Sequence, residues 1–193
     1  MQERGSHDMR DHHANLREDN VMHKSLVCGL AVVGLWLLGG LLVSAQETHD
    51  KAHAELAKAL TSAKVSLAEG LTASASTGTP ISGKFELEEG TLQLSVYTMQ
   101  GDAFSEVIVD HSTGKVTKVE PITSGEDLTA ATAQRAAMAM AKRALPEVVD
   151  TAVKTYTGYR AVSIVPAVKG GHAVAEMVLV KDGTFTTVAE SLD

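Results

Sequence analysis

Residues 102–119, with the sequence DAFSEVIVDHSTGKVTKV, constrain the fold more than any other stretch of the chain. Side chains in 104–109 point alternately to two faces, which is the two-residue period of a strand. Residues 110–114 favour a tight turn, because Asp and Ser bond back to the local backbone and Gly accepts a positive φ. A second strand starts at 115–119. We therefore expect a β-hairpin in which the carboxylate of Asp110 accepts backbone N–H groups of the turn.

Similar signals predict regular structure along most of the chain after residue 47. Apolar side chains at spacings of three and four predict helices over 48–71, with Thr48 as N-cap and Gly70 near the C-terminal end, and over 129–145. Besides the hairpin, alternation predicts strands at 84–88, 91–98, 159–168, 173–180 and 184–188. A helix followed by an antiparallel meander predicts an α+β fold, with the helix on the apolar face of the sheet.

The second half of the chain repeats the strand pattern of the first at an offset of about 70 residues. The corresponding pairs are Leu92 and Val162, Leu94 and Ile164, Gly101 and Gly171, Phe104 and Val174, Glu106 and Glu176, and Ile108 and Val178. This predicts two tandem αβββ modules, 46–121 and 122–193, each with its own antiparallel sheet and a helix packed on one face. The stretch 121–127 has the Pro, Gly, Ser and acidic residues of a boundary.

Residues 22–45 predict an export signal. A basic residue precedes an uncharged apolar run at 26–43, and a small-x-small pattern ending at Ala45 places cleavage before Gln46. The alternative is that the run, just long enough to span a bilayer, stays as an inner-membrane anchor. We therefore expect a periplasmic or secreted protein, whose only membrane contact is this segment if it is not cut. Residues 1–21 are polar and predict a disordered extension or a start codon assigned too far upstream.

Composition and motifs argue against several functional classes. The net charge of −7 argues against a nucleic-acid partner, which requires a basic surface. The single cysteine, Cys28, lies in the apolar run and excludes an intrachain disulfide. The chain has neither a His-Glu-x-x-His nor a Gly-x-Ser-x-Gly motif. His49 and His53 are one helical turn apart, and we interpret them as solvated surface side chains. We assign no catalytic, cofactor or metal residue and expect a protein that is not an enzyme.

The hairpin and its surroundings resemble the PepSY domain, found in the propeptides of thermolysin-like metalloproteases. The pattern V-x-V-D-x-x-T-G-x-V is matched by Val107, Val109, Asp110, Thr113, Gly114 and Val116. The helix at 48–71 and the strand at 92–99 fit the same domain. Residues 128–190 resemble a weaker second copy, in which Val180 replaces Asp110 and Asp182-Gly183 replaces the Thr-Gly turn.

The resemblance implies a non-catalytic module that binds or modulates a protein partner in the cell envelope, with inhibition of a protease among the possible roles. We expect the partner to add an extended segment to an open sheet edge, for which the strands at 91–98 and 159–168 are the candidates. The alternative is an envelope protein that binds a small ligand or a metal in a groove between helix and sheet.

Overall fold

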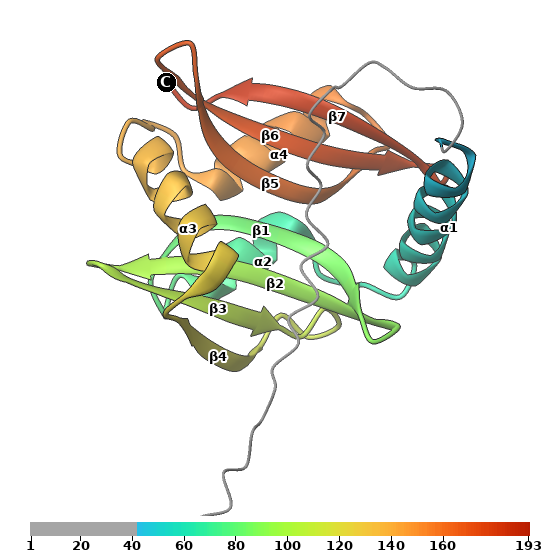
Figure 1. Cartoon of the computed structure of the whole chain (residues 1–193), viewed down its shortest axis with the longest axis horizontal. Helices are drawn as coiled ribbons and strands as arrows, with labels where there is room; N and C mark the ends of the chain where they lie inside the picture. The colour runs from blue at the N-terminus through green and yellow to red at the C-terminus, as the bar shows by residue number, and fades with distance from the viewer. Residues whose placement is uncertain (1–41) are drawn as a thin grey trace, which may run out of the picture. The chain divides into compact units, whose positions relative to one another are not determined.

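A computed structural model describes the backbone of residues 42–193 and the side chains from residue 50 onwards (Figure 1). This part of the chain contains four helices and seven strands. In chain order they are α1 (Leu42–Leu60), α2 (Leu67–Ser74), β1 (Thr79–Glu88), β2 (Thr91–Gln100), β3 (Ala103–Val109), β4 (Val116–Ile122), α3 (Gly125–Met138), α4 (Leu145–Thr155), β5 (Arg160–Lys169), β6 (His172–Lys181) and β7 (Thr184–Ser191).

All seven strands form one sheet in the order β4-β3-β2-β1-β5-β6-β7. Every neighbouring pair is antiparallel, and the two halves of the chain meet where β1 pairs with β5. At this seam Gly83 lies opposite Ile164, and Lys84 lies opposite Ser163. The expected α+β class and antiparallel meanders are confirmed. A separate sheet for each half was expected, however, and one continuous sheet is found.

The prediction of the open edges was wrong. The strand at 91–98 lies within β2, between β1 and β3, and the strand at 159–168 corresponds to β5, between β1 and β6. The edges are instead β4 and β7. The physical reason is that β2 forms hairpins with both β1 and β3, while β5 pairs with β6 on one side and with Gly83 and Lys84 of β1 on the other.

The helix expected over 48–71 is two helices. α1 ends at Leu60, and α2 begins after Ser66, whose side chain accepts from the backbone N–H of Glu69 while the Glu69 carboxylate accepts from the backbone N–H of Ser66. This reciprocal cap satisfies N–H groups that a helix start leaves unpaired, and thereby defines a new helix. Thr48 lies inside α1 rather than at its N-cap, and Gly70 lies inside α2 rather than at a helix end.

The main core lies between the sheet and the helices α2 and α4, which are behind the sheet in Figure 1. Gly83 permits close approach here, because a Cβ at this position would lie 3.2 Å from a methyl carbon of Leu71. α3 covers part of the opposite face, where Ile81, Phe104 and Ala131 form a smaller core. α1 packs at the other end of the sheet, where the ring of His53 stacks on that of Phe185 at 4.4 Å, so His53 is half-buried rather than the solvated side chain expected.

The strands of the two halves correspond in a register different from the one inferred from the sequence. β1, β2 and β3 begin at residues 79, 91 and 103, and β5, β6 and β7 begin at 160, 172 and 184. Each interval is therefore 81 residues, rather than about 70. The strand order agrees with this register, since β1 and β5 are central and β3 and β7 are equally far from the seam. β4 has no counterpart among the described strands of the second half.

The N-terminal predictions fall mostly outside the described residues. The extension at 1–21 and the signal segment up to residue 41 are not described, whereas Ala45 and Gln46 lie on the backbone of α1. Within residues 42–193 no helix is both long and apolar enough to span a membrane.

Candidate functional site

The turn between β3 and β4 has the hydrogen bonds expected from its sequence. One Asp110 carboxylate oxygen accepts from the backbone N–H groups of Ser112 at 2.9 Å and Thr113 at 2.7 Å, and from the Thr113 hydroxyl at 3.0 Å. These bonds lower the pKa of Asp110. Gly114 adopts a φ of +74°, a conformation in which glycine carries no steric penalty. The role of this turn is therefore structural, because the carboxylate is directed into its own loop.

The same turn holds the connection between α1 and α2. The carbonyl of His111 accepts from the backbone N–H groups of Lys64 and Val65, both at 2.9 Å. From the other side, the half-buried guanidinium of Arg160 on β5 donates to the carbonyls of this connection, reaching Val65 at 2.7 Å. Burial lowers the pKa of Arg160, an effect that the nearby carboxylate of Glu69 opposes. A residue of the second half thus fixes a loop of the first.

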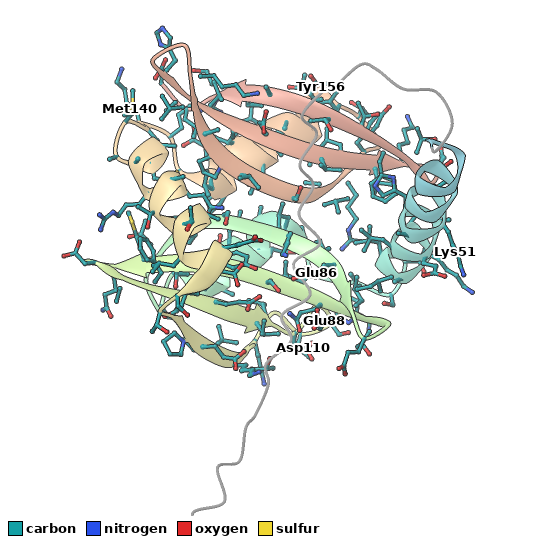
Figure 2. All side chains as sticks on the ribbon, viewed as in Figure 1. Lys51, Glu86, Glu88, Asp110, Met140 and Tyr156 are labelled. Atoms are coloured by element: carbon teal, nitrogen blue, oxygen red, sulfur yellow. The ribbon has the colours of Figure 1, made fainter. Side chains whose placement is uncertain are left out.

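The sheet surface that faces away from α2 and α4, between α1 and α3, is partly exposed, and we call it the open face. Its side chains alternate along the strands with those that enter the main core. Val165 illustrates the exposure, because 38% of its surface is accessible although β5 is an interior strand. Figure 2 shows Glu86 over the sheet between α1 and α3, whereas Lys51 lies on the outer side of α1.

Polar side chains from three adjacent strands meet on the open face, and we call them the central polar cluster. They are Lys84 and Glu86 from β1, Gln93, Ser95 and Tyr97 from β2, and Glu106 from β3. The strand register brings them together, since Lys84 lies opposite Ser95, and Tyr97 lies opposite Glu106.

Hydrogen bonds and an ion pair connect the β1 and β2 members of this cluster. The Lys84 ammonium is 2.6 Å from one Glu86 oxygen, and the buried Ser95 hydroxyl donates to the other at 2.8 Å. Gln93 donates from its amide nitrogen to the Ser95 hydroxyl at 2.9 Å. The Lys84 ammonium also lies 5.7 Å from the centre of the Tyr97 ring. The side chains are consequently held in fixed positions relative to one another, as a preorganised binding surface requires.

Glu106 is in a different electrostatic situation from Glu86. Burial raises the pKa of the Glu106 carboxyl, and the negative charge of Glu86 adds to this, while the neighbouring hydroxyl groups of Ser95 and Tyr97 and the charge of Lys84 act in the opposite direction. Burial also raises the pKa of Tyr97, with further increases from the neighbouring carboxylates. The cluster therefore combines a neutral phenol with one carboxyl group, that of Glu106, whose pKa is raised, and perturbed groups of this kind often mark functional surfaces.

Three further side chains, those of Met138, Met140 and Glu176, lie outside the central polar cluster. Met138 is packed against both cores, whereas Met140 is largely exposed beyond the end of α3. The Glu176 carboxylate, from within β6, pairs with the Lys169 ammonium at the end of β5. Within residues 50–193 no group of three potential metal ligands is present.

A shallow hollow of about 500 Å³ lies on the helical side of the molecule. It is lined by Ser66, Ala68, Glu69, Thr72 and Ala73 of the α2 region and by Asp150 of α4. This hollow lies between helices, whereas the predicted groove between helix and sheet is filled by the main core.

The sequence interpretation missed the central polar cluster, although part of the signal was present. Lys84 and Glu86 alternate with Phe85 along one strand, which already places both charges on the face opposite to an apolar side chain. Their meeting with Glu106 depends on the register between three strands, and the sequence does not specify this register before the pairing is known.

Comparisons with models of protein families, with curated proteins and with solved structures find no match for this chain. The resemblance of the hairpin to the PepSY domain therefore stays a prediction from sequence.

Replacing Glu106 with glutamine should change how stability depends on pH. Because the folded-state pKa of Glu106 is raised, the folded protein binds this proton more tightly than the unfolded chain. The contribution of Glu106 to the free energy of unfolding is thus fully present below the pKa that its carboxyl has in the unfolded chain. This contribution is lost as the pH rises through the pKa that the carboxyl has in the folded protein. The E106Q variant should lack this decline and gain stability relative to wild type towards neutral pH. Urea midpoints measured between about pH 4 and pH 8 test this.

The matched control is Glu88→Gln, because Glu88 lies exposed beside the β1–β2 turn (Figure 2). It removes one surface carboxylate outside the central polar cluster, so it measures the effect of losing one charge at the surface. An E106Q difference that changes with pH no more than that of Glu88→Gln would show that Glu106 is solvated as fully as an unfolded-state carboxyl.

Proposed function

We propose that this chain is an exported, non-catalytic binding module of the PepSY type, and that it binds a protein partner through its open face. The observation that carries the proposal is the exposed polar and apolar surface on interior strands of the sheet. An antiparallel sheet is stable with one face packed and one solvated, so the second face is available for a partner without unfolding.

The chemistry of the open face suits a protein surface. It combines an ammonium, two carboxyl groups, an amide and a tyrosine with the exposed Val165, and mixed surfaces of this kind with aromatic anchors are typical of interfaces between proteins. Export follows from the predicted signal at 22–45, and a protease is the class of partner that the PepSY resemblance implies. The partner would bind to side chains of the open face. This replaces the binding mode expected from the sequence, in which the partner adds a strand at 91–98 or 159–168.

The chain also offers support for a duplicated origin of the fold. The constant interval of 81 residues between corresponding strands is accompanied by similar helix starts, with Leu67 and Glu69 in α2 matching Leu145 and Glu147 in α4. We therefore interpret the fold as two related αβββ units that share one sheet, the first of them extended by β4.

A matched pair of valine variants tests the binding surface. Val165→Arg places a long cation on the open face, whereas Val119→Arg does the same on edge strand β4, where 47% of Val119 is exposed. Val119 lies opposite the buried Val107, so it is on the other face of the sheet. The protein recovered from expressing cells, with its N-terminus established by intact mass, serves as bait in an envelope extract. Captured proteins are identified by mass spectrometry.

We expect the wild type and V119R to enrich the same partner and V165R to lose it, with an affinity roughly 30-fold lower if Val165 borders a contact worth about 2 kcal/mol. A captured protease whose activity falls with added protein would establish inhibition as the role. Equal capture by both variants would exclude the open face as the binding surface.

Binding of a small ligand is the second candidate function, favoured by the hollow beside Asp150. A wild type that captures nothing but shows a ligand-induced thermal shift, abolished in Asp150→Asn, would support it.

A further inference from the structure

β7 is an edge strand without the features that usually protect an edge. Its sequence, TFTTVAES, has a single charge and no proline, and it is rich in β-branched residues. The other edge, β4, carries Lys118, Glu120 and Pro121, which oppose pairing with a further strand. Within the described chain, β3 is covered by β4, whereas its counterpart β7 is not covered by any strand. The two edges are therefore not equivalent, and β7 is the one suited to pairing.

The ladder between β6 and β7 determines which backbone groups of β7 point outward. Leu192 donates its backbone N–H to the carbonyl of Ala173 at 3.0 Å, and the register continues without a shift to the pair of Lys181 and Thr184. Because the direction alternates along an antiparallel strand, the even-numbered residues of β7 bond to β6 and the odd-numbered residues face outward.

Arg143 shortens the available edge. Its guanidinium, which comes from the connection between α3 and α4, donates to the carbonyl of Ser191 at 3.0 Å. The outward residues with both backbone groups available are then Phe185, Thr187 and Ala189. This set is symmetric about Thr187, so it is complementary to the same set running in the opposite direction.

We propose that β7 pairs with β7 of a second copy of this chain, antiparallel about a two-fold axis at Thr187. In this register Thr187 lies opposite its equivalent, and Phe185 lies opposite Ala189. The remaining pairs are Thr186 with Val188 and Thr184 with Glu190, so no charge faces a like charge across the ladder. A two-fold axis perpendicular to the sheet closes the assembly at two copies and keeps both open faces on the same side.

Sedimentation velocity over a wide range of concentration, using the protein as recovered from expressing cells, tests the proposal. The wild type should show a monomer–dimer equilibrium. Thr187→Pro removes an outward N–H at the axis without removing a bond to β6, so it should be monomeric throughout. Thr187→Ala keeps the backbone donor and should still dimerise. Thr187→Lys places two cations together at the axis, so its dimer should be weakened, and high salt should restore it.

Each variant is first compared with the wild type by thermal unfolding at low concentration, which separates loss of pairing from loss of fold. A wild type that stays monomeric at all concentrations would overturn the proposal, and so would a dimer that Thr187→Pro leaves unchanged. A monomer that binds a synthetic TFTTVAES peptide would also overturn it, since the edge would then accept an extended peptide but not a second folded copy.

Discussion

Replacing Arg160 with alanine should lower the free energy of unfolding by about 3 kcal/mol, because several charge-assisted hydrogen bonds disappear together. The guanidinium donates to the carbonyls of Leu60 at 3.3 Å, Ala63 at 3.1 Å and Val65 at 2.7 Å. It also lies 5.2 Å from the centre of the Phe85 ring. Alanine would remove the guanidinium donor from all three part-buried carbonyls, of which that of Leu60 would keep its bond from the backbone N–H of Ala63. Urea denaturation followed by circular dichroism measures the loss.

Two further arginine variants show whether the geometry of the guanidinium matters. Arg160→Lys keeps the charge, but a single ammonium does not reproduce a planar fork, so it should recover only part of the stability. Arg135 also lies over an aromatic ring, that of Phe104 at 5.6 Å, but Arg135→Ala should cost much less, because its ion pair is with the fully exposed Asp102. If Arg160→Ala were as mild as Arg135→Ala, water would be replacing the guanidinium at the three carbonyls.

Replacing Gly70 with valine should cost about 3 kcal/mol through overpacking. A Cβ at this position would lie 2.4 Å from a methyl carbon of Leu94, and Leu94 is fully buried. The higher helix propensity of valine offsets only a small part of this cost. Leu94→Ala alone should cost about 3 kcal/mol by leaving a cavity. Both values follow from urea denaturation of the single variants.

The double variant should be considerably more stable than the sum of the two losses implies. In the proposed correspondence between the two halves, the residues that match Gly70 and Leu94 are Val148 and Ala175, both buried in the same core. The small and the large residue have thus changed places between helix and strand. Gly70→Val with Leu94→Ala copies this arrangement, and a double-mutant cycle measures the coupling. Simple additivity would show that the two halves do not pack their helices in equivalent positions.

The elements themselves were largely predictable, because strand alternation and turn chemistry are local. The hairpin at 102–119 and the strands of the second half are present near their predicted positions. The break between α1 and α2 was missed because the apolar stripe continues across it in sequence, while the capping pair Ser66 and Glu69 was overlooked. The joining of both halves into one sheet was not predictable in this way, since Gly83 and Ile164 pair across a long sequence separation.

The candidate site was harder to predict than the fold. The turn residues Asp110, Thr113 and Gly114 were found from local sequence, and their bonds are local. The side chains of the open face act together only because β1, β2 and β3 align in one register. The role of Arg160 in holding the α1–α2 connection was not predictable from any sequence pattern, because its partners are main-chain carbonyls about 100 positions earlier in the chain.

The seam between β1 and β5 has a consequence for how the molecule can be divided. Only two residue pairs form its register, compared with nine between β1 and β2. Packing of α2 against α4 and the bonds of Arg160 supplement this short ladder. The halves are therefore joined mainly by the side chains of their common core rather than by a long ladder of backbone hydrogen bonds. The short link from Ile122 to Gly125 holds them at a high effective concentration, so their association is insensitive to dilution.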